Sequence, residues 1–123
     1  MTREEMKART KDFAKRIVTL CSALPEDWVA RTLGRQLLRS GTSVGANYRA
    51  VCRAKSTANF LNKLRIVEEE CDESLFWMEL LVECELVKAA RLNSLMQEAN
   101  ELLSITVAAA RTTRTSNARA ARS

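Results

Sequence analysis

The chain has 123 residues, 46% of them apolar, with one proline, three glycines, two tryptophans, one tyrosine and three phenylalanines. This length suits one domain, and the composition favours an all-helical protein over a β-sandwich or barrel. The formal net charge is +5 and histidine is absent, which excludes Ser/His and Cys/His catalytic pairs and histidine-containing di-iron sites.

Other sequence features point away from metal and membrane chemistry. The four cysteines are far apart and form no CxxC pair, so buried free thiols are a better interpretation than a zinc site. The longest apolar runs are far shorter than the roughly 18 residues that a membrane span needs, and no signal peptide is visible. We therefore expect a cytoplasmic protein with no catalytic residues, no metal, no cofactor and no membrane contact.

Two helices are predicted in the first half of the chain. Thr2 and Glu5 can form a capping box for the first, whose apolar face extends to about residue 23. Pro25, followed by the acidic pair Glu26 and Asp27, is typical of the start of a second helix, which continues to about Ala54.

The second half of the chain predicts two further helices and a tail. Ser56 or Thr57 can cap a third helix, which ends near Val87, and a fourth amphipathic helix extends from about Leu92 to Ala110. The last residues, TTRTSNARAARS, are basic and expected to be disordered. Long helices with short connections predict an all-α, up-down-up-down antiparallel four-helix bundle at residues 1–111, followed by a disordered basic tail at 112–123.

The third helix carries a second apolar stripe. At about 100° per residue, Ile66, Trp77, Leu80 and Cys84 lie opposite the stripe that faces the bundle core. Such a stripe favours a subunit interface that includes Ile66, Trp77 and Leu80. The alternative is a set of isolated exposed apolar residues, which protein surfaces tolerate.

The segment RSGTSVGANYRA places Gly41 and Gly45 inside the second helix. The helical pattern continues through both glycines, beside the apolar stripe, where small side chains allow another backbone to approach closely. We assign both glycines to the oligomer interface. The alternative is a kink or hinge between two shorter helices.

Charge is segregated along the chain. Residues 28–67 hold eight basic residues and no acid, whereas residues 68–87 hold eight acids and no base. Five arginines of the second helix fall within roughly 40° of one line, opposite the buried leucines, and arginines recur in the acid-free tail. We predict that these residues bind nucleic-acid phosphate: Arg31, Arg35, Arg39, Arg49, Arg53, Arg111 and Arg114. The alternative is that acids of the third helix pair with the arginines.

Two segments, RQLLRSGTSVGANYRAVCRAKS and FLNKLRIVEEECDESLFWMELL, resemble a bacterial family of four-helix-bundle proteins encoded in intervening sequences of large-subunit ribosomal RNA genes. That family is similar to the accessory variability proteins of diversity-generating retroelements. The resemblance covers about residues 10–105. It implies a barrel-like homopentamer without enzymatic activity, and in the retroelement branch such pentamers bind a reverse transcriptase and its template RNA through basic surfaces.

The residues that carry this resemblance form two motifs. The first extends from Arg39 to Asn47 and reads Ser-Gly-Thr-Ser-x-Gly-Ala-Asn after the arginine, and the second comprises Glu70, Glu73 and Trp77. Where family members often have an acid after the first motif, this chain has Arg49 and Arg53.

Two functions remain open. The first is a noncatalytic nucleic-acid-binding accessory protein, with RNA or DNA as ligand and possible partnership with a reverse transcriptase. The alternative is an oligomeric protein-interaction scaffold of the ribosomal RNA intervening-sequence family that makes no direct nucleic-acid contact.

Overall fold

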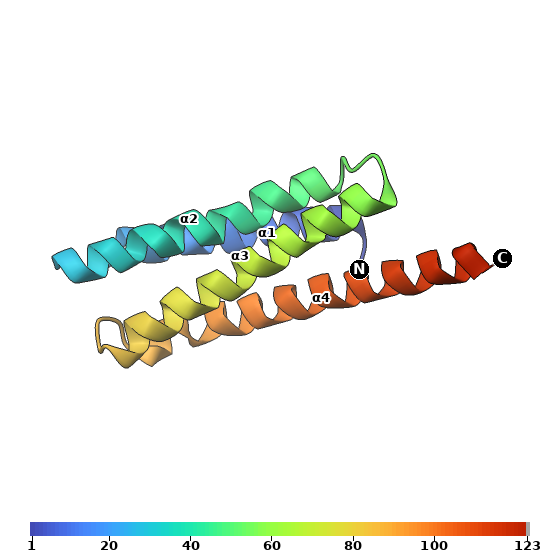
Figure 1. The fold of residues 1–123 in the computed structure, drawn as a ribbon. Coiled ribbons are helices and arrows are strands. Elements are labelled where there is room, and N and C mark those ends of the chain that lie inside the picture. The colour runs from blue at the N-terminus through green and yellow to red at the C-terminus, as the bar shows by residue number, and fades with distance from the viewer. Residues whose placement is uncertain (123) are drawn as a thin grey trace.

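The structure is a computed structural model that describes residues 1–122. Four helices follow one another along the chain: α1 (Arg3–Ser22), α2 (Trp28–Val51), α3 (Thr57–Glu83) and α4 (Ala89–Arg122). Short connections make consecutive helices antiparallel, as Figure 1 shows. The all-α fold with four helices is therefore as predicted.

The core is built from one apolar stripe of each helix. Phe13 of α1, Leu37 of α2, Met78 of α3 and Leu102 of α4 are completely buried, and together they belong to a single hydrophobic cluster. Burial of a side chain of this size stabilises the fold by about 1.5–3 kcal/mol. Tertiary packing, rather than helix propensity alone, thus holds the four helices in place.

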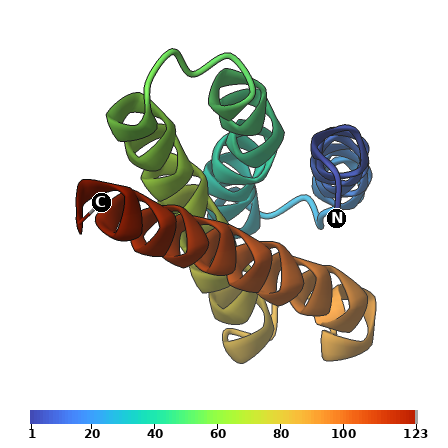
Figure 2. The ribbon, with the colours of Figure 1, turned by 90° about the vertical axis from the view of Figure 1, so that its right-hand side faces the viewer.

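The four helices are not packed equally against one another. The helix α2 packs along both α1 and α3, and α3 also packs along α4, whereas α1 and α4 approach each other over only a short stretch. Figure 2 shows α4 crossing in front of α3 at an angle. The edge between α1 and α4 is consequently the most open side of the bundle.

Side chains cap the first three helices. The predicted capping box is present, with Glu5 N donating to Thr2 Oγ1 at 3.1 Å and Thr2 N donating to Glu5 Oε2 at 3.2 Å. Ser56 caps α3 through a 3.0 Å hydrogen bond from Asn59 N. The start of α2 predicted at Pro25, Glu26 and Asp27 is close to the observed one: Asp27 is the N-cap, accepts a 3.0 Å hydrogen bond from Ala30 N, and the helix begins at Trp28.

Two helix ends differ from the predicted ones. The helix α2 ends at Val51 rather than Ala54. The helix α3 ends at Glu83 rather than Val87, because Glu85 adopts a left-handed conformation with φ 60°. The amide of Leu86 then donates to Leu81 O at 2.9 Å and that of Glu85 to Val82 O at 3.0 Å. This hydrogen-bond pair is a Schellman motif, which turns the chain out of the helix.

The helix α2 continues through its glycines, as predicted, and they face α1. A Cβ atom added to Gly41 would lie 2.8 Å from the side chain of Ile17, and one added to Gly45 would lie 3.2 Å from Thr10 O. Both glycines are buried. Their assignment to an oligomer interface is therefore wrong, because the close approach that they permit is made inside the chain, with α1.

The end of the chain is also more ordered than predicted. Residues 112–122 were expected to be disordered, but α4 continues without a break to Arg122, while Ser123 lies outside the described residues. Neither proline nor glycine interrupts this segment, and it is rich in alanine and arginine, which are good helix formers. We call residues 111–122 the C-terminal arm, and Figure 1 shows it projecting beyond the other three helices.

Candidate nucleic-acid interface

The five arginines predicted on the second helix are all exposed, four of them on α2 and Arg53 in the turn that follows Val51. Two of the five form ion pairs with carboxylates. Arg39 forms ion pairs with Glu70, at 3.3 Å, and with Glu73, both on α3. Arg31 forms a longer ion pair of 3.6 Å with Glu26. The predicted row is therefore interrupted, and the alternative of pairing by acids of the third helix holds for Arg39.

The other three arginines of this predicted row are exposed and form no ion pair within residues 1–122: Arg35 and Arg49 on α2, and Arg53 just after it. At 1.5 Å per residue, Arg49 is about 21 Å along the helix from Arg35. Arg49 and Arg53 thus belong to the end of the bundle at which α2 finishes, and Arg35 is remote from them.

Antiparallel topology brings basic segments together at that end. From the start of α1 the side chain of Arg3 reaches the first turn of α3, where its guanidinium lies over the ring of Phe60, 5.7 Å from the ring centroid. Figure 2 looks onto this end and shows the start of α3 between the end of α2 and the C-terminal arm, with the start of α1 on the other side of α2. We call this surface the basic end, and it comprises seven cations without an ion pair among the described residues: Arg3, Arg49, Arg53, Lys55, Lys63, Arg111 and Arg114.

Few acids oppose these cations. Glu4 and Glu5 are the acidic residues in the first turn of α1. The carboxylate of Glu5 is occupied by the capping box, and Glu4 pairs with Lys7 at 3.5 Å. Unpaired cations on one surface repel each other and attract a polyanion, so this surface favours binding to phosphate groups.

The C-terminal arm supplies part of the basic end. Ala110 is the last buried residue of α4, and beyond Thr113 every described side chain is exposed. The arm has four arginines and no acid. The arm continues α4, whose earlier turns pack against α3, so the helix presents Arg111 and Arg114 at the basic end.

A groove between α1 and α2 extends the basic surface, and sequence reasoning missed it. Its volume is about 500 Å³, and its lining includes Lys11 and Arg49, together with Lys7 and its ion-pair partner Glu4. Lys7, Lys11 and Lys15 recur every four residues in the first helix. That spacing was a signal for one basic helix face, although only the fold shows that this face adjoins α2.

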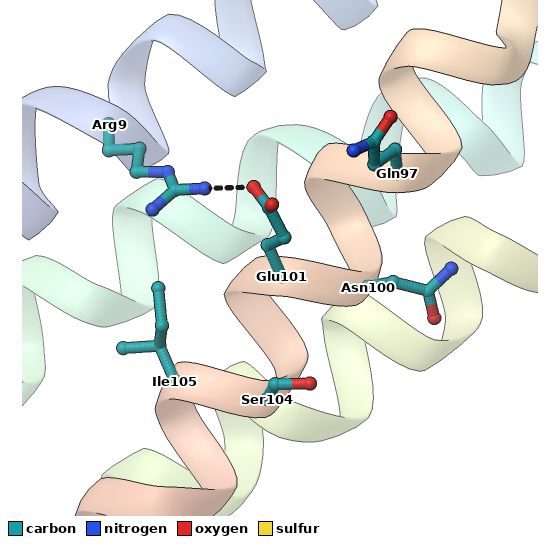
Figure 3. Close-up of a pocket in the computed structure, with 6 residues that line it drawn as sticks. All are labelled: Arg9, Gln97, Asn100, Glu101, Ser104 and Ile105. Atoms are coloured by element: carbon teal, nitrogen blue, oxygen red, sulfur yellow. Dashed lines mark hydrogen bonds and ion pairs between the residues drawn. The ribbon is translucent and has the colours of Figure 1, made fainter.

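The largest of the described grooves, about 680 Å³, lies along the open edge between α1 and α4. Figure 3 shows Arg9 pointing across it to Glu101. Arg9 also donates two 2.7 Å hydrogen bonds to Glu98, and this contact lowers the pKa of the Glu98 carboxyl. Because two carboxylates neutralise Arg9, this groove does not belong to the basic surface. The ion pairs of Arg9 instead connect α1 to α4.

The remaining predicted interface residues of α3, Ile66, Trp77 and Leu80, are half-buried. Trp77 Nε1 donates to Glu73 Oε2 at 3.0 Å, and its ring meets Phe76 edge to face at 4.9 Å. Phe76, which sequence reasoning did not select, is 53% exposed. The part of this stripe open to a partner thus centres on Phe76, and the role of the stripe as an interface stays a prediction.

The two cysteine thiols whose pKa is raised by burial are poor nucleophiles. Burial raises the pKa of Cys71 to about 12 and that of Cys21 to about 11, so both are protonated at neutral pH. In residues 1–122 no three Cys, Asp or Glu side chains converge as metal ligands. No helix in this range combines the length and apolar character that crossing a membrane requires.

Comparison with known proteins agrees with this fold. Residues 4–108 match the family described as 23S rRNA-intervening sequence protein. The chain belongs to this family. A crystal structure of a protein of unknown function from the S23 ribosomal protein family of Bacteroides thetaiotaomicron is 33% identical to it. The similarity covers 90% of this chain and 99% of that one, with a TM-score of 0.83.

The family membership and the four-helix fold inferred from the two motifs are thus confirmed. No curated protein is similar enough to count as a match. The further resemblance to the accessory proteins of retroelements stays a prediction.

Proposed function

We propose that this protein is a noncatalytic nucleic-acid-binding accessory protein that holds RNA or DNA phosphates at its basic end. The observation that carries the proposal is the convergence of unpaired cations from α1, α3, the end of α2 and the C-terminal arm. Each cation that meets a phosphate releases a condensed counterion, and this release drives binding that weakens steeply with salt. The protein is expected to act in the cytoplasm.

The proposal places the centre of the interface at Arg49, Arg53, Arg111 and Arg114. Arg31 and Arg39 contribute less, because binding a phosphate would require them to leave their carboxylate partners. Arg35 is a separate, solitary cation near the opposite end. The predicted set of seven arginines is thereby divided into four central and three peripheral residues.

Self-association belongs to the same proposal. The resemblance to accessory variability proteins implies a homopentamer with a reverse transcriptase as partner. A ring of subunits would present several basic ends to one nucleic acid, which raises avidity without a new kind of contact. Support within the chain comes from the outward side of α3, where Phe76 is exposed beside Trp77. Light scattering on the purified protein tests this part, and a monomer at micromolar concentration contradicts it.

The scaffold remains a second candidate because of that same aromatic pair. Exposed aromatic residues are typical anchors of protein interfaces. In this case nucleic acid would reach the complex only through a partner protein, and the isolated chain would not retain it.

The decisive experiment compares two double variants of equal charge. Arg49→Gln/Arg53→Gln removes two cations of the basic end, whereas Lys88→Gln/Arg91→Gln removes two exposed cations at the opposite end. We expect the first variant to bind a short RNA or DNA about tenfold more weakly at low salt and to reduce the salt slope by about 1.5, from two lost phosphate contacts. The second variant should bind like the parent protein.

Two results contradict the proposal. Equal weakening in both variants means that net charge, rather than the basic end, attracts the nucleic acid. Unchanged retention in both variants, or no retention by the parent protein, leaves the scaffold as the better function.

A further inference from the structure

An apolar cleft opens in the middle of the basic end. It has a volume of about 180 Å³, and residues of all four helices line it. Its walls are apolar or aromatic side chains, and Arg3 lies at its margin. The principal lining residues are Met6 of α1, Tyr48 of α2, Phe60 and Leu64 of α3, and Ile105 of α4. We call it the end cleft.

The fold explains why this cleft is not filled. The helices α1 and α4 approach each other over only a short stretch, so at this end no side chain closes the space between them. Phe60 belongs to the first turn of α3, where it is only half-buried and its ring borders the cleft. An aromatic surface is thus left beside a cavity that solvent can reach.

Size and chemistry restrict what the cleft can hold. Sites for drug-sized ligands have volumes of roughly 300–1,000 Å³, and the end cleft is smaller. Its walls suit a flat, weakly polar ring. Burial raises the pKa of Tyr48 to about 12, so the phenol stays protonated at neutral pH and adds no negative charge to the cleft.

The basic residues around the cleft favour a ligand that carries negative charge. Arg3 lines it and stacks on Phe60. Arg53 and Lys55 follow the lining residue Val51 by two and four positions, and both are exposed. A group that fills this cleft best therefore combines a flat ring with a phosphate a short distance away.

We infer that the end cleft receives one unpaired nucleobase while Arg3, Arg53 and Lys55 hold the adjoining phosphates, so that the protein prefers single-stranded nucleic acid. This inference rests on the proposed function and specifies its ligand. In a duplex the bases are stacked on their neighbours and cannot enter, whereas in a single strand one base can leave the stack and pack against Phe60.

The first test measures binding of one RNA as a single strand and as a duplex, at equal salt, with parent protein and two matched variants. Phe60→Leu removes the aromatic ring but keeps an apolar side chain, and Phe76→Leu makes the same change at an exposed residue outside the basic end. We expect the parent to bind the single strand about tenfold more tightly, from one base–aromatic contact. Phe60→Leu should lose that preference while its duplex affinity and helical circular dichroism stay unchanged, and Phe76→Leu should keep the preference.

A second test needs no variant. A single strand carrying 4-thiouridine is irradiated with the parent protein, and the attached peptides are identified by mass spectrometry. We expect attachment at the peptides that contain Tyr48 or Phe60. Attachment confined to other peptides overturns the inference.

The outcomes separate this inference from the proposed function. Equal affinity for single strand and duplex, together with weakening by Arg49→Gln/Arg53→Gln, overturns the end cleft but retains nucleic-acid binding at the basic end. In that case an apolar side chain of a partner protein would be the better candidate to fill the cleft. Absence of binding to either form overturns both proposals.

Discussion

The three glycines of α2 show how the neighbour of a residue decides its role. Gly41 and Gly45 face rigid neighbours, the β-branched side chain of Ile17 and the backbone of Thr10. Gly34 faces only the tip of Leu24, a half-buried and flexible side chain. All three glycines occupy helical positions where alanine is favoured by up to about 1 kcal/mol. The surroundings therefore determine whether a glycine-to-alanine substitution stabilises or destabilises the protein.

We therefore expect opposite effects from two identical substitutions. Gly41→Ala forces a methyl group against Ile17, and the overpacking outweighs the gain in helix propensity, so the free energy of unfolding falls by about 1 kcal/mol. Gly34→Ala displaces only the end of Leu24, and stability stays equal or rises by up to about 1 kcal/mol. Urea unfolding followed by circular dichroism measures both. A stable Gly41→Ala variant would show that α1 can move away from α2 at little cost.

The arginines illustrate the same dependence for charge. Arg39 and Arg53 fall on one face of the helix that the sequence predicts, although Arg53 lies in the turn after α2. Local sequence does not tell them apart. Arg39 meets carboxylates that lie 31 and 34 residues further along the chain, whereas Arg53 meets none among the described residues. Helix periodicity predicted the exposed row, but which arginines remain free depends on the packing of α3 against α2.

At the scale of the element, the end of α3 contains a local conflict between sequence and backbone. The Schellman motif normally places glycine in its left-handed position, because other residues lose about 1–2 kcal/mol there. Here Glu85 occupies the position with φ 60°. The packing of Leu81 and Leu86 in or against the core stabilises the turn and offsets this cost.

Replacement of this residue should stabilise the protein. We expect Glu85→Gly to raise the free energy of unfolding by about 1 kcal/mol, since it removes the steric penalty at a residue whose side chain is exposed. Thermal unfolding measures the gain, and Glu79→Gly, at an exposed position inside α3, is the control that should destabilise the protein by about the same amount. A loss of stability in Glu85→Gly would mean that the side chain itself supports the turn.

The C-terminal arm is helical, although the sequence predicts disorder there. That prediction depends on the apolar pattern of α4, which fades after Ala110. Loss of an apolar face removes the core contact, but it does not remove helix propensity, and the segment contains no breaking residue. The structure accordingly has a helix without a neighbouring helix along its last turns.

At the scale of the whole molecule, up-down topology converts a pattern along the chain into a pattern in space. The basic segment that ends α2 and begins α3 lies at one end of the bundle, beside the start of α1 and the arm. The acidic end of α3 lies at the other. This polarity separates the surface proposed to bind nucleic acid from the exposed aromatic pair of α3.

An ion pair between Arg9 and Glu98 connects the first and last helices of the bundle. Ionised Glu98 is stabilised by Arg9, so its pKa in the folded protein is lowered. A lowered carboxyl pKa contributes stability that is present above the unfolded pKa of about 4.3 and is lost as pH falls through the folded pKa.

We expect Glu98→Gln to lower the free energy of unfolding at neutral pH by about 1 kcal/mol, because this pair is bidentate and largely shielded from water. The difference from the parent should shrink as pH falls below about 4.3. Denaturant unfolding across this range measures it, with Glu69→Gln as control, since the exposed pair of Glu69 and Arg65 contributes little. A deficit that persists in acid would arise from packing rather than from charge.

The sequence by itself determined what depends on near neighbours. Four helices, the capping box at Thr2, the cap at Ser56, the continuity of α2 and the family motifs all follow from residues within a few turns of each other. Tertiary structure decided which arginines lack a carboxylate, that the glycines face α1, and that Tyr48, Phe60 and Ile105 surround one cleft. Those relations join residues far apart in the chain, and packing selects them through contacts that helical periodicity does not encode.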